Sequence, residues 1–309
     1  MIAQLLLYKI LQLFLIMILG FVFVKAKLVK SGDSAVLSRL SLYLFMPSVI
    51  INAFNVEVTS DIMKGLMIAF LLAVLIHIVL LLVDLVLKKY FKATKVERAS
   101  IVYSNSGNLI VPIVTYVLGE EWLIYSSAFL IVQLVFFWTH GVKLFSDQKV
   151  GLKKILLNIN VIAVVVGFVM LFSGIRLPNF VSEITSSLGA MVAPVGMIIA
   201  GMLAASVDFG KMLKNKRLYF VLLGRLIVCP VIVMFLMRGI LPFIGIANIH
   251  TIMLISYFAS ITPTAATVMQ FSQIHGKDFD YATAINVITT IGCIISMPLL
   301  IMIFNSVVI

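Results

Sequence analysis

Acidic residues are scarce in this chain, and charged residues of either sign are few. Twelve Asp and Glu stand against 23 Lys and Arg, and together they make up only 11% of 309 residues. Soluble domains carry about 25% charged residues, so this composition excludes an ordinary soluble domain. Cysteine is limited to Cys229 and Cys293, both inside apolar runs. That placement argues against a disulfide framework or a cysteine-bound metal, and we expect no cofactor.

Hydrophobic residues make up most of the chain. The chain is 62% hydrophobic, its mean hydropathy is +1.20, and apolar runs long enough to cross a bilayer recur throughout. We therefore predict an all-α polytopic membrane protein. The first run, residues 10–24, is interpreted as a permanent span, because it lacks a small-x-small cleavage site and Lys25 and Lys27 follow at once.

Ten spans are predicted where apolar runs alternate with charged breaks. They are residues 7–25, 34–54, 63–87, 96–118, 122–145, 153–173, 185–206, 217–237, 250–273 and 280–304.

The basic residues predict the orientation of these spans. Most lie in alternate loops, at span ends and not in one patch, so we expect a lipid bilayer and no nucleic acid as partner. By the positive-inside rule, both termini are outside and the loop between spans five and six is cytoplasmic; we expect the plasma membrane. The residues on the crowded side are Lys25, Lys27, Lys30, Arg39, Lys88, Lys89, Lys92, Lys95, Arg98, Lys143, Lys149, Lys153, Lys154, Lys211, Lys214, Lys216, Arg217 and Lys277.

The two halves of the chain share a pattern of glycine and proline. Five spans per half predict two repeats of inverted orientation, residues 1–146 and 152–309. Inverted repeats with interrupted helices are typical of secondary transporters whose site lies at the membrane midplane. The matching pairs, in the same order in each half, are Gly20 with Gly167, Pro47 with Pro194, and Pro112 with Pro263.

Spans four and nine carry polar interruptions that predict broken helices. Residues 104–112 read SNSGNLIVP, and we expect unwinding near residues 107–112 because of Gly107 and Pro112. Span nine repeats the design around Pro263. Broken backbone at membrane depth is tolerated where it is buried or lines a cavity, so the breaks are predicted to cross. Each then presents a helix N-terminus to an anion. The alternative is a proline kink with ordinary polar helix packing.

Few polar side chains in the spans can serve such a site. The amides of Asn105, Asn108 and Asn286 can donate to a carboxylate, and Arg225 can select a second negative charge. For Asn286 the alternative is helix–helix packing, and for Arg225 it is snorkelling or a contact with a helix C-terminus.

Coupling to an ion has equally few candidates. His77 in span three can carry a proton, with a packing role as the alternative, and Gln270 is a further possible coupling residue. Gln133 and Gln270 are also weaker candidates of the same kind as Arg225. No Asp or Glu falls at residues 100–117 or 252–273, which argues against a carboxylate cation site at the crossing.

The chain resembles the auxin efflux carrier family, which includes plant PIN proteins and bacterial permeases for malate or malonate. The resemblance covers essentially the whole chain. It is carried by Phe45-Met46-Pro47, Asn105-Ser106-Gly107-Asn108 with Pro112, Ala193-Pro194, Arg225 with Pro230, Thr262-Pro263, and Ser296-Met297-Pro298-Leu299.

That resemblance implies an NhaA-like fold of ten helices with helices four and nine crossed. Spans one, two, six and seven would form a scaffold that dimerises, and spans three to five and eight to ten a transport domain. It implies carboxylate binding by Asn105, Asn108 and Asn286, with Thr262 and Thr264 beside the second break. The loop at residues 146–152 is far shorter than in the plant proteins, so the chain looks like the short bacterial members.

These observations predict an elevator-type secondary transporter of small carboxylates such as malate or malonate. Coupling to H⁺ or Na⁺ stays open. The alternatives are a sodium-coupled carrier similar to bile-acid symporters and, more distantly, a polytopic membrane enzyme or a channel. The chain has no HExxH or GxSxG motif, which argues against the enzyme.

Overall fold

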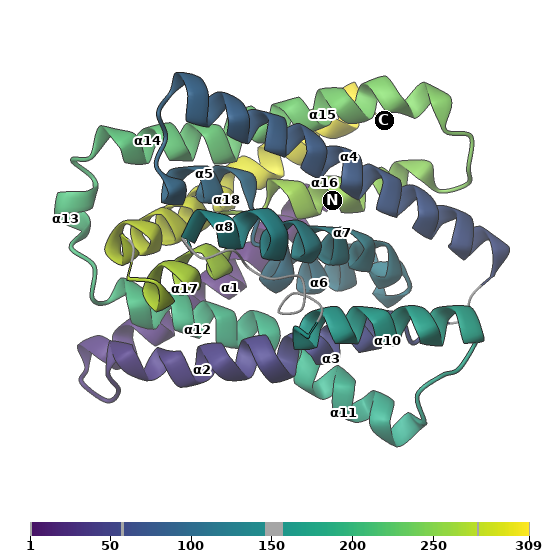
Figure 1. The fold of residues 1–309 in the computed structure, drawn as a ribbon, viewed down its shortest axis with the longest axis horizontal. Helices are drawn as coiled ribbons and strands as arrows, with labels where there is room; N and C mark the ends of the chain where they lie inside the picture. Colours follow the sequence, from purple (N-terminus) through teal and green to yellow (C-terminus); the bar gives the residue numbers. More distant parts are fainter. Residues whose placement is uncertain (1, 57–58, 146–156, 277, 309) are drawn as a thin grey trace.

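The computed structural model describes residues 2–56, 59–145, 157–276 and 278–308, and every regular element in these ranges is a helix (Figure 1). Long apolar runs form helices because, in lipid, each helix satisfies its own backbone hydrogen bonds. In the described ranges, seven helical stretches are long and apolar enough to cross a membrane, and three shorter apolar helices accompany them. The chain is therefore a multi-pass, all-helical membrane protein.

Most predicted spans coincide with one helix or with a helix that bends. In chain order the helices are α1 Ile2–Lys25, α2 Ser34–Leu40, α3 Met46–Ala53, α4 Ser60–Tyr90, α5 Lys95–Val102, α6 Ser106–Val117, α7 Leu123–Phe136, α8 Val142–Phe145, α10 Ile159–Ser173, α11 Asn179–Ala190, α12 Val192–Ala204, α13 Phe209–Met212, α14 Lys216–Leu223, α15 Cys229–Ile240, α16 Ile249–Ile261, α17 Ala266–Ile274 and α18 Phe279–Val307.

Three of these spans contain a π-helical turn. The turns are Ser41–Phe45 between α2 and α3, Phe137–Gly141 between α7 and α8, and Gly224–Val228 between α14 and α15. Two of them stand directly before a proline, Pro47 or Pro230, near the start of the next helix. Such turns are frequent at functional sites, and two of the three border the cavity described below.

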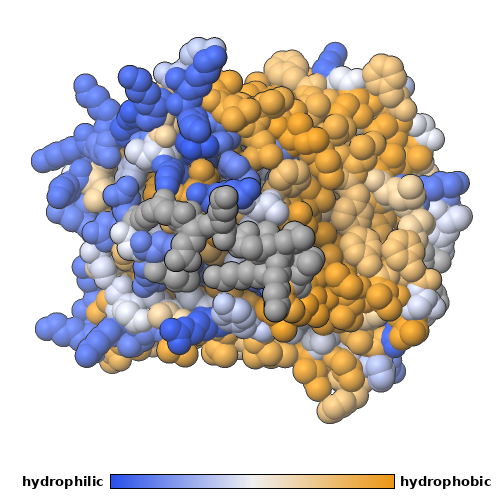
Figure 2. Space-filling model, viewed as in Figure 1, coloured by the Kyte–Doolittle hydropathy of each residue, from blue (hydrophilic) through white to orange (hydrophobic). Residues whose placement is uncertain are grey.

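The outer surface carries large apolar side chains where lipid would contact it. Leu15, Phe172, Phe180 and Ile295 are among the exposed ones, and Figure 2 shows an apolar surface across the middle and right of the molecule. Hydrophilic residues gather at the left, where Figure 1 places the turn after α1 and the short helix α13.

Glycines allow two pairs of helices to approach closely. In α12, a side chain on Gly201 would collide with the carbonyl of Met17 in α1, and one on Gly20 of α1 with the carbonyl of Ile198. Likewise, a side chain on Gly167 of α10 would collide with the ring of Phe54, which follows α3. Small residues are the usual means of close helix contact in membranes.

Two groups of helices can be followed in Figure 1. Helices α2, α3, α10, α11 and α12 lie along the lower side, and α4, α14 and α15 along the upper side. Helix α1 packs along α12, and α3 packs against α10 and α11. The predicted loop at 146–152, the start of the sixth predicted span at 153, and Lys149, Lys153, Lys154 and Lys277 lie outside the described residues.

Candidate functional site

The chain crosses itself where two helices are interrupted. Residues 103–105 separate α5 from α6, and residues 262–265 separate α16 from α17. Ser104 and Thr264 face each other as an antiparallel bridge. The amide of Asn105 donates to the carbonyl of Pro263 at 2.7 Å, and that of Ala265 to the carbonyl of Tyr103 at 3.0 Å. Each break therefore satisfies backbone groups of the other, which buried irregular backbone requires.

The expected break at residues 107–112 is wrong. Gly107 lies in the first turn of α6, and Pro112 lies inside that helix. A proline within a helix deprives only the carbonyl four residues earlier of its donor, here that of Asn108. The chain instead leaves the helix where a facing segment offers backbone partners. Pro263 does lie in its break, so Pro112 and Pro263 are not spatial equivalents; the residue opposite Thr264 is Ser104.

Two side-chain amides from neighbouring helices hold the crossed segments. From α7, Gln133 donates Nε2 to the carbonyl of Ser104 at 2.9 Å and accepts the Ser104 hydroxyl at 2.6 Å. From α18, Asn286 donates Nδ2 to the carbonyl of Thr264 at 2.7 Å. The amide N–H of Thr264 donates to the hydroxyl of Thr289 at 3.2 Å. Asn286 thus holds the second break and does not line the cavity, which matches its alternative interpretation.

Arg225 lies in the π-helical turn before α15 and is fully buried. Its guanidinium donates to the carbonyls of Thr262 at 2.8 and 3.0 Å, of Ile101 at 3.1 Å, and of Ser260. These carbonyls stand at the C-terminal ends of α5 and α16, which carry partial negative charge. The structure therefore places Arg225 at helix C-termini, the alternative stated for it, and not on the cavity wall.

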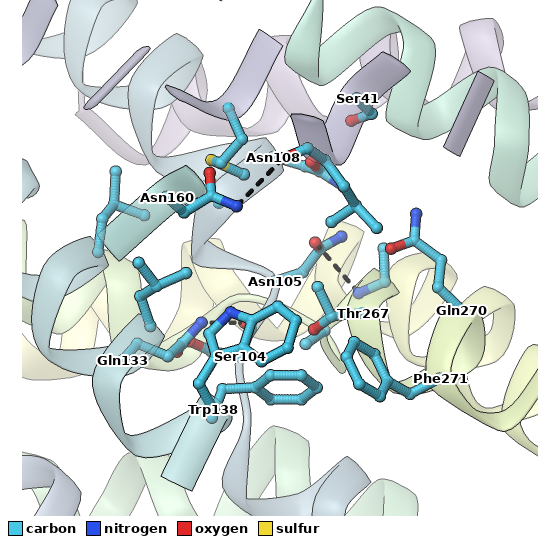
Figure 3. Close-up of a pocket in the computed structure, with 18 of the residues that line it drawn as sticks. Ser41, Ser104, Asn105, Asn108, Gln133, Trp138, Asn160, Thr267, Gln270 and Phe271 are labelled. Atoms are coloured by element: carbon cyan, nitrogen blue, oxygen red, sulfur yellow. Dashed lines mark hydrogen bonds between the residues drawn. The ribbon is translucent and has the colours of Figure 1, made fainter. Parts of the chain in front are cut away.

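A cavity of about 80 Å³ lies on the other side of the crossing. It is bounded by the two breaks, by the turn before α3, by α7 with its π-helical turn, and by the start of α10 (Figure 3). A single buried water needs only about 10–15 Å³, so the space admits a small solute. The polar side chains lining it are Ser41, Ser104, Asn105, Asn108, Gln133, Asn160, Thr267 and Gln270.

The cavity brings together five of the predicted residues: Asn105, Gly107, Asn108, Gln133 and Gln270. Among the described residues, none that lines it carries a charge. Sequence reasoning missed Asn160, although an asparagine beside the long apolar run of α10 was a usable signal. It also missed Trp138 and Phe271, which form an aromatic wall (Figure 3); nothing distinguishes them in the sequence from other aromatic residues of a membrane helix.

Several buried amide atoms at the cavity have no partner within the described chain. They are Nδ2 of Asn105, Oδ1 of Asn160 and Oε1 of Gln270. Their other atoms are partly engaged, since Asn105 accepts from the amide of Ala266 at 3.4 Å and Asn160 donates to the carbonyl of Leu42 at 3.1 Å. An unsatisfied buried polar atom costs about 1–3 kcal/mol. Such a cluster is therefore expected where water or a ligand supplies the missing partners.

Asn108 enters this region because α12 carries glycine opposite it. A Cβ atom on Gly196 would stand 2.6 Å from Nδ2 of Asn108.

Both half-helix N-termini face the cavity. Helix α6 begins at Ser106 and α17 at Ala266, and residues 105, 107 and 265–267 line the wall. Neither helix receives a side-chain cap from its own N-cap residue. The amide of Ala266 already donates to Oδ1 of Asn105, and the dipoles of both helices favour negative charge at these ends. With the C-terminal ends neutralised by Arg225, the crossing presents its positive ends to the cavity.

The remaining predicted residues lie elsewhere. His77 in α4 contacts the carbonyl of Ala73 through Nδ1 at 2.7 Å, and its ring stacks on that of Phe136. Thr262 donates its hydroxyl to the carbonyl of Ala259 at 3.1 Å, and Thr264 donates to that of Ser100 at 2.9 Å. These hydroxyls are engaged with backbone and do not line the cavity.

Comparison with known families gives a match that spans nearly the whole chain. A family model described as membrane transport protein matches residues 5–155 and 147–301, one segment in each half. No curated protein matches the chain.

Proposed function

Because this chain belongs to the membrane transport protein family, the family of the auxin efflux carriers, we propose that it is a secondary transporter of small organic carboxylates. Malate- and malonate-like acids are the expected substrates. One observation carries the proposal: two helix N-termini and the unpartnered Nδ2 of Asn105 meet in one cavity.

The donors of the cavity suit a carboxylate. A carboxylate oxygen accepts hydrogen bonds only, and it would find Nδ2 of Asn105, the amide of Asn108 and the first-turn N–H groups of α6 and α17. Hydrogen bonds to a charged group contribute about 1.5–3 kcal/mol each. An amide site also avoids burying an ammonium group, so the anion can leave again.

Arg225 favours a carrier that needs no sodium at the crossing. Where sodium is coupled to transport by crossed helices, unwound carbonyls and half-helix C-termini coordinate the ion. In this chain, the carbonyls of Ile101, Ser260 and Thr262 already accept from Arg225. The guanidinium supplies the positive charge that sodium would bring, so we expect any coupled ion to be a proton.

The helix packing supports ten spans in two inverted repeats, residues 1–146 and 152–309. Gly20 of the first span contacts the seventh span, and Gly167 of the sixth contacts the end of the second. In an inverted repeat these two contacts are equivalent. The hydrogen bonds from Gln133 to the first break and from Asn286 to the second form a similar pair, because these residues come from the fifth and tenth predicted spans.

We propose an elevator motion on the same basis. Spans one, two, six and seven would form the scaffold and dimer contact, and the crossed helices with their neighbours the moving domain. The cavity lies between these groups, since Ser41 and Asn160 come from the scaffold side and Asn105 and Gln270 from the moving side. The basic end of the molecule would face the cytoplasm and both termini the exterior of the plasma membrane.

Uptake into proteoliposomes tests the function directly. Malate, malonate, lactate and an aromatic acid would be offered at several pH values, with and without sodium. We expect saturable uptake with counterflow for at least one acid, unchanged by sodium. Asn105→Ala and Asn108→Ala should each lower uptake about tenfold, since each loses a bond to a charged group. The exposed Asn305→Ala is the control. Equal uptake in all three variants would contradict the site, and non-saturating flux would contradict a carrier.

A further inference from the structure

A second polar cluster lies beside the cavity, around His140. This residue lies in the π-helical turn between α7 and α8, and its side chain is 26% exposed. Its Nε2 lies 3.2 Å from Oδ2 of Asp84, and its Nδ1 lies 2.9 Å from the phenol oxygen of Tyr103. Arg98 binds both oxygens of Asp84 at 2.8 and 2.5 Å. The cluster thus joins α4, α5, the first break and the turn after α7.

The hydrogen-bond roles in this cluster depend on one proton. A carboxylate only accepts, so Nε2 of His140 carries a proton toward Asp84. Tyr103 has one proton to donate, either to the carbonyl of Phe136 at 3.0 Å or to Nδ1 of His140. If Nδ1 is protonated, the ring donates to both neighbours and Tyr103 donates to Phe136. If Nδ1 is unprotonated, Tyr103 turns to the ring and Phe136 loses that donor.

Tyr103 and the turn that carries His140 both adjoin residues of the cavity wall. Tyr103 directly precedes Ser104, and its carbonyl accepts from the amide of Ala265 at the second break. The turn that carries His140 also contains Phe137 and Trp138, which line the cavity. A change of proton at His140 therefore acts on both the crossed backbone and the aromatic wall.

We propose that His140 is the proton-binding residue that couples pH to the carboxylate site, an inference that rests on the proposed function. A proton from the solution binds Nδ1 of His140 and later returns to the solution, so no other reactant is needed. An imidazole ring can bind and release such a proton at either ring nitrogen. His77, in contrast, is 1% exposed and lies against Ala73 and Phe136.

Among the described residues, titratable groups from several neighbouring segments lie near this turn. Asp84 faces the ring from α4, Arg98 lies behind that carboxylate from α5, and Tyr103 faces it from the first break. Lys143 lies one turn further in α8. His275 directly follows α17 and stacks on Phe271 of the cavity wall with ring centres 5.7 Å apart, so it serves as the control.

Tryptophan fluorescence tests proton binding without any substrate. The chain has two tryptophans, so Trp122→Phe leaves Trp138, two residues from His140, as the reporter. We expect its emission to change once as the pH of the sample is varied, because the charge of the ring beside it changes. The titration should vanish in His140→Gln and persist in His275→Gln. Persistence in His140→Gln, or loss in His275→Gln, would overturn the proposal.

Uptake then tests the link to transport. In the wild type, carboxylate uptake should change at least threefold across the same pH range, and His140→Gln should flatten the profile. Tyr103→Phe keeps the imidazole but removes the relay, so fluorescence should still titrate while the uptake profile flattens. A pH profile unchanged in both variants refutes the coupling. Absence of uptake of every acid at every pH refutes the proposed function, while fluorescence still decides whether His140 binds the proton.

Discussion

Replacement of Arg225 by methionine is the sharpest perturbation that the structure offers. Methionine fills much of the same volume, but it donates no hydrogen bond and carries no charge. The carbonyls of Ile101, Ser260 and Thr262 would lose this donor in a fully buried place. The C-terminal ends of α5 and α16 would face each other without a cation between them.

The size of the effect follows from these contacts. A buried carbonyl left without a partner costs about 1–3 kcal/mol, and three are left here. Removal of one partner from a buried charged contact costs about 3–5 kcal/mol in measured cases, so we expect a loss near the top of that range. For a chain of this length, 1 kcal/mol lowers Tm by roughly 2 °C, which predicts a fall of roughly 10 °C.

Thermal unfolding of the purified protein in detergent measures this loss. The Tm of Arg225→Lys should fall about half as far, because an ammonium group keeps the charge but cannot donate to three carbonyls in the geometry of a guanidinium. Arg238→Met removes an exposed arginine of α15 that donates to the carbonyl of Val307, and it should change Tm by about 1 °C or less. If Arg225→Met unfolds like wild type but loses its preference for malonate over lactate, Arg225 binds substrate and the structural role is refuted.

Three further predictions concern the crossing and the cavity. Gln133→Leu and Asn286→Leu each remove the side-chain amide that donates to a backbone carbonyl of a break. Each should lower the free energy of unfolding by about 1–3 kcal/mol, measured by denaturant unfolding. A change below 0.5 kcal/mol in either variant would show that the amide does not stabilise the break. Pro112→Ala should alter uptake less than twofold, because Pro112 lies inside α6. A tenfold loss of uptake would show that Pro112 belongs to the substrate site. Gly196→Ala should raise the KM of uptake about tenfold, because its Cβ displaces the amide of Asn108; an unchanged KM would show that this amide does not bind substrate.

The fold class and the existence of a crossing were predictable from the sequence. Length and hydropathy of apolar runs are local properties, and the bilayer demands helices wherever such runs occur. Polar residues in predicted spans four and nine likewise indicated interrupted helices, because unsatisfied polar groups are costly in the hydrocarbon region. Asn105 and Asn108 were found in this way.

Only the tertiary structure decided where the helices break and what each polar residue does there. Pro112 was a local signal for a break, but the break formed at residues 103–105, where the segment at 262–265 supplies backbone partners. Arg225 reaches Ile101 across 124 residues of sequence, and no local pattern shows that a helix C-terminus lies within its reach. Hydrophobicity acts along the chain, whereas buried hydrogen bonds are satisfied by whichever group folding brings near. The sequence by itself therefore determined that polar segments interrupt two apolar helices, and the tertiary structure determined which of their residues face the cavity.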